Sequence, residues 1–275
     1  MIETYTVEGG GGVPLSVMAA GPRDGRAILF IHGFSQSRLS WMAQFEGALA
    51  ERYRLVAFDL RGHGGSGRPE RTASYTAGRL WAEDLAAVIA GSGIDRPVLV
   101  GWSYAGFVIA DYLRRFGAEG IAGLNLVAAS TLIGTDEVLS LLGQGLLANT
   151  PAMCGGDLDA GIAATRRFVR ACSARPLPPD RHETMLAFNM MVPPFVRRAL
   201  FSRTEDFDDV LSSFRLPTLL THGTADDIVL PAMTDRIARA MPAARLSLYD
   251  RVGHMPFMED QPRFDRELAA FVDAT

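Results

Sequence analysis

A serine at a strand-to-helix turn is the first feature of this sequence that could carry out chemistry. Ser103 lies in residues 101–105 (GWSYA), after an apolar run and before a helical pattern. Such a turn strains the serine backbone and exposes its hydroxyl, and small residues two positions either side let strand and helix approach. Gly101 and Ala105 occupy those positions, so we expect Ser103 to be a nucleophile. The alternative is a glycine-rich strand end that holds a serine by chance.

A serine hydroxyl needs an adjacent base near neutral pH. The five histidines of the chain are His32, His63, His182, His222 and His254. In one common order of serine triads the histidine comes last, and only His254 follows every suitable acid. It lies in residues 253–256 (GHMP), where glycine and proline favour an irregular loop that can aim the imidazole.

The acid is expected after the preceding apolar run, in residues 221–229 (THGTADDIV). Two adjacent carboxylates compete there. We expect Asp226 to accept a hydrogen bond from His254, fix its tautomer and stabilise the imidazolium. Asp227 is then a solvated or loop-bracing neighbour, although the register of the motif is all that separates the two.

Two backbone N–H groups are needed to hold an oxyanion. We expect one from Tyr104, at the start of the helix after Ser103, and one from Phe34 in residues 32–34 (HGF). His32 is expected to hold that loop. His63, in a glycine-rich loop, is expected to be a structural hydrogen-bonding residue rather than a metal ligand or second base.

These side chains must be positioned by an alternation of strands and helices. A β-hairpin is expected in the first 20 residues, and apolar runs predict six further strands at 27–31, 55–58, 97–100, 124–128, 217–221 and 246–249. Helical spacing predicts helices at 41–50, 80–89, 107–116, 233–241 and 264–272. Continuous apolar strands alternating with helices indicate an α/β fold with a mostly parallel eight-stranded sheet covered on both faces.

The alternation is interrupted between residues 131 and 214, where no strand is evident and Leu, Met and Phe recur at helical spacings. We expect a helical cap over the open end of the sheet, where ligands bind in such folds, inserted before the last strands. Residues 1–130 and 215–275 would form the core. Plain extra helices are the alternative. Expected substrate-binding residues are Phe34, Ser35, Trp102, Tyr104, Met153 and Phe188, although the cap side chains could simply pack on one another.

The composition excludes several other classes of function. All 27 basic residues are arginine, which excludes lysine Schiff-base chemistry and a Walker-type lysine. The arginines are scattered and the net charge is −4, so no nucleic-acid partner is expected. No apolar run is long enough for a membrane span and no secretory signal is visible, which favours a cytoplasmic protein. The only two cysteines, Cys154 and Cys172, are expected to be reduced thiols, with a disulfide between them as the alternative.

No metal or other cofactor is expected. No Cys-x-x-Cys pair is present, which argues against cysteine-based zinc or iron–sulfur sites. Gly62, Gly64 and Gly67 fit a dinucleotide-binding pattern with Asp84 downstream, but no helix pattern begins at these glycines.

Taken together these motifs resemble the α/β-hydrolase superfamily over essentially the whole chain. Residues 32–34 resemble its oxyanion loop, 59–64 (DLRGHG) a strand-end motif, 101–103 the nucleophile elbow, 223–226 the acid loop and 253–254 the base loop. The resemblance is nearest to small serine carboxylesterases, including pimeloyl-carrier methyl ester esterases, and to cofactor-free haloperoxidases. The latter often carry proline after the oxyanion aromatic, where this chain has Ser35. Haloalkane dehalogenases and epoxide hydrolases of the family carry aspartate at the elbow, so Ser103 argues against their chemistry.

The resemblance implies a serine hydrolase that cleaves small to medium-sized carboxylic esters through an acyl-enzyme. Its partner would be a small-molecule ester, and both monomer and homo-oligomer remain open. Peracid formation, lactone opening and carbon–carbon bond cleavage could use the same triad. A non-catalytic ligand receptor is a different class. A carrier-protein thioesterase or acyltransferase is another, and it could use the cap arginines Arg166, Arg167, Arg170, Arg197 and Arg198 against an acidic carrier.

Overall fold

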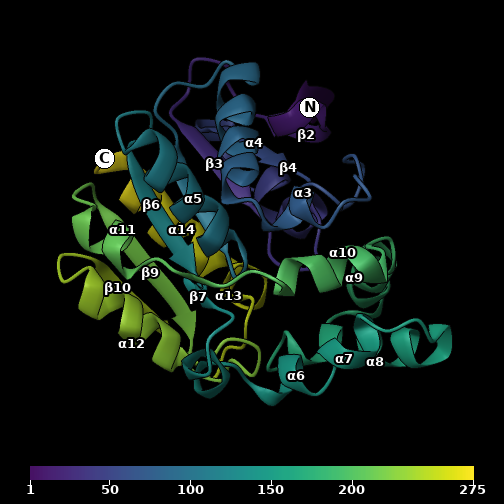
Figure 1. Ribbon diagram of the computed structural model, residues 1–275. Coiled ribbons are helices and arrows are strands. Elements are labelled where there is room, and N and C mark those ends of the chain that lie inside the picture. The colour runs from purple at the N-terminus through teal and green to yellow at the C-terminus, as the bar shows by residue number, and fades with distance from the viewer.

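The computed structural model describes all 275 residues and is built on one large twisted sheet (Figure 1). Its strand order is β1-β2-β4-β3-β5-β6-β9-β10. The strands are β1 (Glu3–Glu8), β2 (Pro14–Ala20), β3 (Ala27–Ile31), β4 (Arg54–Phe58), β5 (Val98–Trp102), β6 (Gly123–Val127), β9 (Thr218–Gly223) and β10 (Arg245–Tyr249). Only β2 runs antiparallel to its two neighbours, β1 and β4. The predicted mostly parallel eight-stranded sheet is therefore confirmed.

Helices cover both faces of this sheet. The long ones are α4 (Gly78–Gly91), α5 (Ala105–Phe116), α12 (Pro231–Ala240) and α14 (Gln261–Asp273). Helices α4 and α5 pack together on one face, and α14 lies on the other (Figure 1). The central strands β3, β4, β5 and β6 are buried along their entire length, as expected for parallel strands covered on both sides.

The prediction of a single helix at residues 41–50 is wrong. The structure has a 3-10 turn, η2 (Arg38–Trp41), followed by two short helices, α1 (Met42–Phe45) and α2 (Leu49–Arg52). The break falls at Gly47, where an added Cβ would lie 2.8 Å from the Ala43 carbonyl oxygen. The apolar spacing read as one helix therefore belongs to two turns joined by a tight bend.

The segment between β6 and β9 is mainly helical, as predicted. Its elements are η3 (Glu137–Leu141), α6 (Gln144–Leu147), α7 (Thr150–Met153), α8 (Leu158–Ala171), α9 (Pro179–Met190), α10 (Pro194–Phe201) and α11 (Asp208–Ser213). Two short strands were not predicted. β7 (Leu132–Ile133) and β8 (Glu205–Asp206) pair antiparallel and tie the two ends of the segment together. Helices α6–α10 lie together beyond one end of the sheet (Figure 1), and we propose that residues 131–214 are the cap.

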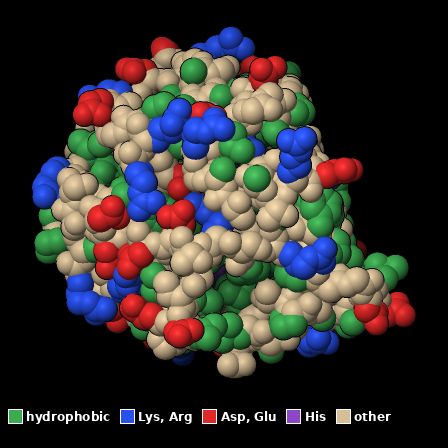
Figure 2. All heavy atoms as spheres, in the orientation of Figure 1, with side chains coloured by type: hydrophobic (Ala, Val, Ile, Leu, Met, Phe, Trp, Pro, Cys, Tyr) green, Lys and Arg blue, Asp and Glu red, His purple; other side chains and the backbone are tan.

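Charged side chains of both signs are interspersed over the face shown in Figure 2. This pattern fits the sequence, in which 27 arginines and 31 acidic residues give a net charge of −4. No helix combines the length and the apolar character needed to cross a membrane.

Candidate active site

Ser103 lies at the sharp turn between β5 and α5. Its backbone has a φ of 58°, a conformation that residues other than glycine rarely adopt. Close packing of strand and helix makes this turn possible. An added Cβ on Gly101 would lie 2.4 Å from Ile109 Cδ1, and one on Gly106 would lie 2.3 Å from the Ser130 carbonyl oxygen. Glycine is therefore a steric requirement at position 106, where the neighbouring atom is a backbone oxygen. At Gly101 the neighbouring atom is the end of the flexible Ile109 side chain.

His254 and Asp226 form a buried pair. His254 Nδ1 donates to Asp226 Oδ2 across 2.6 Å, which leaves Nε2 of the neutral ring as the proton acceptor. The other carboxylate oxygen accepts the backbone N–H groups of Ile228 (2.8 Å) and Val229 (3.1 Å). Burial acts to raise the pKa of Asp226, but His254 and the hydrogen bonds to the carboxylate outweigh it and lower this pKa to about 2. The acid therefore stays ionised beside the imidazole.

Contacts across the sheet bring His254 next to the elbow. The indole Nε1 of Trp102 donates to the His254 carbonyl oxygen at 2.8 Å, and the two rings have centroids 5.3 Å apart. The His254 N–H donates to the carbonyl oxygen of Cys172, at the end of α8. The Ser103 hydroxyl makes no hydrogen bond with a protein atom in the structure. Catalytic serine–histidine hydrogen bonds often tighten only when substrate binds.

The loop after β3, residues 32–37, runs directly against the serine and is called the β3 loop below. An added Cβ on Gly33 would lie 2.8 Å from Ser103 Cβ, so only glycine allows this approach. The backbone N–H groups of Phe34 and Tyr104 donate to no acceptor in the protein. Two free donors beside one hydroxyl are the arrangement that an oxyanion hole requires.

His32 and His63 both hold the β3 loop, whereas the sequence predicted this role for His32 and only a general structural role for His63. His32 Nε2 accepts the Leu60 N–H at 3.0 Å and Nδ1 donates to the Gly33 carbonyl oxygen. His63 Nε2 accepts the Ser35 N–H at 3.2 Å. Burial lowers the pKa of His32 to about 4 and that of His63 to about 3. Both rings are therefore neutral at physiological pH, and each uses its two nitrogens for structural hydrogen bonds.

The second carboxylate and a third histidine support the acid loop. Asp227 accepts the backbone N–H groups of Gln144 (3.1 Å) and Gly145 (3.0 Å) at the start of α6, so it braces the cap. His222 Nε2 lies 3.0 Å from Asp226 Oδ2. No role for His222 was predicted from the sequence. Its position at the end of β9, four residues before the acid, was the available signal.

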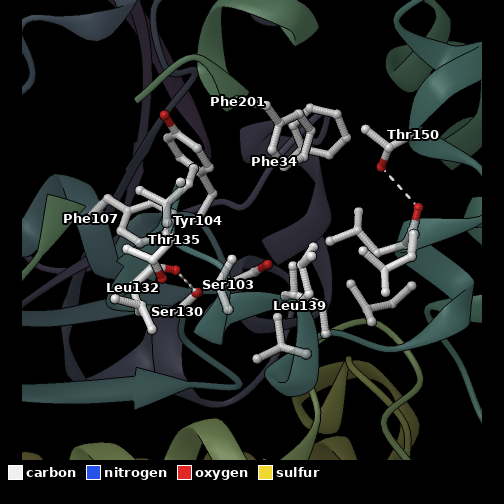
Figure 3. Close-up of a pocket in the computed structure, with 18 of the residues that line it drawn as sticks. Phe34, Ser103, Tyr104, Phe107, Ser130, Leu132, Thr135, Leu139, Thr150 and Phe201 are labelled. Carbon is white, nitrogen blue, oxygen red and sulfur yellow. Dashed lines mark hydrogen bonds between the residues drawn. The ribbon is translucent and has the colours of Figure 1, made fainter. Parts of the chain in front are cut away.

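A cavity of about 640 Å³ opens beside Ser103. Figure 3 shows Ser103 between Tyr104 and Phe107 on one side and Leu139 on the other, with the rings of Phe34 and Phe201 together above it. Fifteen of its 24 lining residues are hydrophobic. Its walls come from the loops after β3, β5, β6 and β9, from the start of α5 and from the cap.

The cavity wall differs from the predicted one. Phe34 and Tyr104 line it, but Ser35, Trp102, Met153 and Phe188 do not. Ser35 Oγ accepts a hydrogen bond from a cap arginine, and Trp102 packs beneath the site. Met153 and Phe188 are buried among the cap helices, which was the alternative considered for them.

Seven of the fifteen hydrophobic lining residues come instead from the first part of the cap. These residues are Leu132, Ile133, Val138, Leu139, Leu142, Leu146 and Leu147. They follow β6 at the carboxyl edge of the sheet, and that position was the signal that could have found them.

The glycine-rich loop after β4 holds no dinucleotide-type helix, and the first helix after it is α3 (Ala73–Thr76). Asp84, the residue that would contact a ribose, is instead buried in an ion pair with Arg61 at 2.7 Å and accepts the Gly10 N–H. No cluster of three His, Cys, Asp or Glu side chains could hold a metal ion.

Comparison with known proteins identifies the family. Residues 28–267 match the model of the alpha/beta hydrolase family, so the chain belongs to that family. A candidate aryl esterase from Burkholderia cenocepacia is 36% identical, with a TM-score of 0.90 over 99% of this chain and 98% of that one. An esterase from Rhodococcus sp. ECU1013 is 33% identical, with a TM-score of 0.91 over 98% of each chain. A non-heme haloperoxidase of Rhodococcus erythropolis is 27% identical over 91% of this chain and 93% of that protein.

Proposed function

We propose that this alpha/beta hydrolase is a serine esterase that cleaves carboxylic esters with a small or medium-sized apolar part. The observation that carries the proposal is the strained Ser103 placed against two free backbone N–H groups, with the buried His254–Asp226 pair beside the same turn. The esterases with similar structures support the same class of substrate.

In the proposed mechanism, His254 Nε2 takes the Ser103 hydroxyl proton as Oγ attacks the ester carbonyl carbon. The N–H groups of Phe34 and Tyr104 hold the oxyanion, and Asp226 stabilises the imidazolium. The tetrahedral intermediate then expels the alcohol, which receives the proton from His254. Water attacks the resulting acyl-enzyme by the same route, which releases the acid and restores the serine.

The cavity supports an apolar group of moderate size. Its volume lies within the range of pockets that enclose small molecules. The wall beside Ser103 is formed by aromatic and leucine side chains, which favours burial of an alkyl or aryl group over a charged one.

The test is hydrolysis of a panel of p-nitrophenyl esters by the wild type and by Ser103→Ala. We expect the variant to lose turnover and fluorophosphonate labelling while its fold, followed by circular dichroism, survives. The matched control is Ser140→Ala, which removes an exposed hydroxyl from η3, outside the cavity. Full activity in Ser103→Ala would refute the proposal.

Peracid formation is a second candidate, favoured by the similarity to the non-heme haloperoxidases. In that reaction hydrogen peroxide, instead of water, would attack the acyl-enzyme. Comparing hydrolysis with perhydrolysis of one acetate ester in the same enzyme preparation separates the two. A dominant perhydrolysis rate at millimolar peroxide would replace the esterase proposal.

A further inference from the structure

A buried arginine of the cap carries no counter-ion. Arg197, on α10, is 2% exposed and forms no ion pair with a carboxylate. Its guanidinium donates to Ser35 Oγ (3.1 Å), the Met153 carbonyl oxygen (3.0 Å), Thr165 Oγ1 (3.4 Å) and the Asn189 carbonyl oxygen (2.5 Å). One side chain thus joins α7, α8, α9 and α10 to the β3 loop. Burial lowers the pKa of Arg197 to about 10, so it remains charged at neutral pH.

An uncompensated buried charge is costly, and neutral side chains could fill the same space. This cost points to a role beyond packing. Arg197 is one of the cap arginines that could have met an acidic carrier protein, but its burial removes it from any such surface.

The residue that Arg197 contacts in the β3 loop is strained. Ser35 has φ of 62°, a value that a non-glycine residue adopts only when its surroundings enforce it. Its N–H donates to His63 from the core, and its hydroxyl accepts from Arg197 of the cap. A second cap contact, from Asn189 Nδ2 to Gln36 Oε1, reaches the next residue. The β3 loop is thus held from both sides.

This strained residue directly follows Phe34, whose free N–H belongs to the loop that runs against Ser103. We propose that Arg197 is a positioning residue that holds Ser35, and through it the Phe34 N–H, in the orientation that receives the oxyanion. The inference rests on the proposed esterase function, and it makes the cap part of the catalytic geometry as well as a cover.

The kinetic test compares Arg197→Met and Ser35→Ala with the wild type, using one short p-nitrophenyl ester. Arg166→Met is the matched control, since Arg166 is an exposed arginine of the same cap that makes no hydrogen bond or ion pair. We expect kcat to fall about 10- to 100-fold in Arg197→Met with KM changed by less than about twofold, since a misplaced donor acts on the transition state. Inhibition by an alkyl boronic acid should weaken by a similar factor.

Ser35→Ala keeps the arginine and removes only the contact to the loop. It should reproduce most of the loss, and the double variant Ser35→Ala/Arg197→Met should add little to it, because both act through one contact. An unchanged kcat in both single variants, or a loss confined to KM, would overturn the inference.

A readout independent of turnover is amide hydrogen exchange of residues 33–36. We expect faster exchange in Arg197→Met and in Ser35→Ala, and wild-type exchange in Arg166→Met. If the wild type hydrolyses no ester, the proposed function fails, while the exchange data still decide whether Arg197 holds the loop. If Arg197→Met does not fold, Ser35→Ala alone tests the inference. Unchanged amide exchange of residues 33–36 in Ser35→Ala would then overturn it.

Discussion

His63, one of the two neutral histidines that hold the β3 loop, makes the folded protein less stable in acid. His63 has an ordinary pKa of 6.5 when unfolded, and burial lowers the pKa to about 3 in the folded protein. The folded state therefore resists protonation that the unfolded state accepts. The stability that the neutral His63 contributes is complete above pH 6.5 and is lost progressively as the pH falls from 6.5 toward 3.

The size of this effect follows from the two pKa values. At pH 5 the unfolded chain binds almost one proton at His63 and the folded chain binds almost none. At about 1.36 kcal/mol per pH unit, the loss between pH 8 and pH 5 is about 2 kcal/mol. With a urea slope of about 3 kcal/mol per molar, the urea midpoint should fall by about 0.7 M because of this residue.

The assay is urea unfolding at pH 8 and pH 5 for the wild type and His63→Gln. Glutamine keeps an acceptor toward the Ser35 N–H but does not titrate, so the fall in stability between the two pH values should be about 2 kcal/mol smaller in the variant. Groups that titrate in both proteins cancel in this comparison. His182→Gln, a cap histidine outside the site, is the control and should behave as the wild type. Equal falls in the wild type and His63→Gln would refute the reasoning.

The remaining predictions concern the acid and the cavity. Asp226→Asn should lower kcat about 10³- to 10⁴-fold, because it removes the charge that fixes the imidazole. Asp227→Asn should change kcat far less, because that side chain braces α6. Comparable losses of kcat for the two variants in steady-state assays would contradict the assignment of Asp226 as the acid. Leu139→Trp fills the cavity wall at a half-exposed position, so KM should rise for octanoate esters and stay near the wild-type value for acetate esters. Leu158→Trp, at an exposed cap leucine away from the cavity, is its control, and an equal effect on both ester lengths in Leu139→Trp would contradict the cavity assignment.

Local patterns predicted the sheet well because each buried strand is a continuous apolar run. The run at residues 27–31 coincides with β3, and the elbow serine follows β5 as expected. The prediction failed at residues 41–50, since apolar spacing does not reveal a bend at Gly47 that approaches the preceding turn too closely for a side chain.

The cap shows a second limit of local patterns. Its helical character could be predicted, yet Met153 and Phe188 face the cap interior while the leucines after β6 face the cavity. Which side of a short helix meets a ligand depends on how several helices pack together, and residue type does not specify that packing.

The amino-acid sequence alone determined which groups could react, because the strand-turn-helix around Ser103 and the order of Asp226 and His254 are local features of the chain. Only the tertiary structure decided how those groups are supported. His222 meets Asp226 and Arg197 meets Ser35 through folding, and the second pair is separated by 162 residues. A buried charge is tolerated only where distant carbonyl and hydroxyl oxygens converge on it, and that convergence exists only once the cap has docked on the sheet.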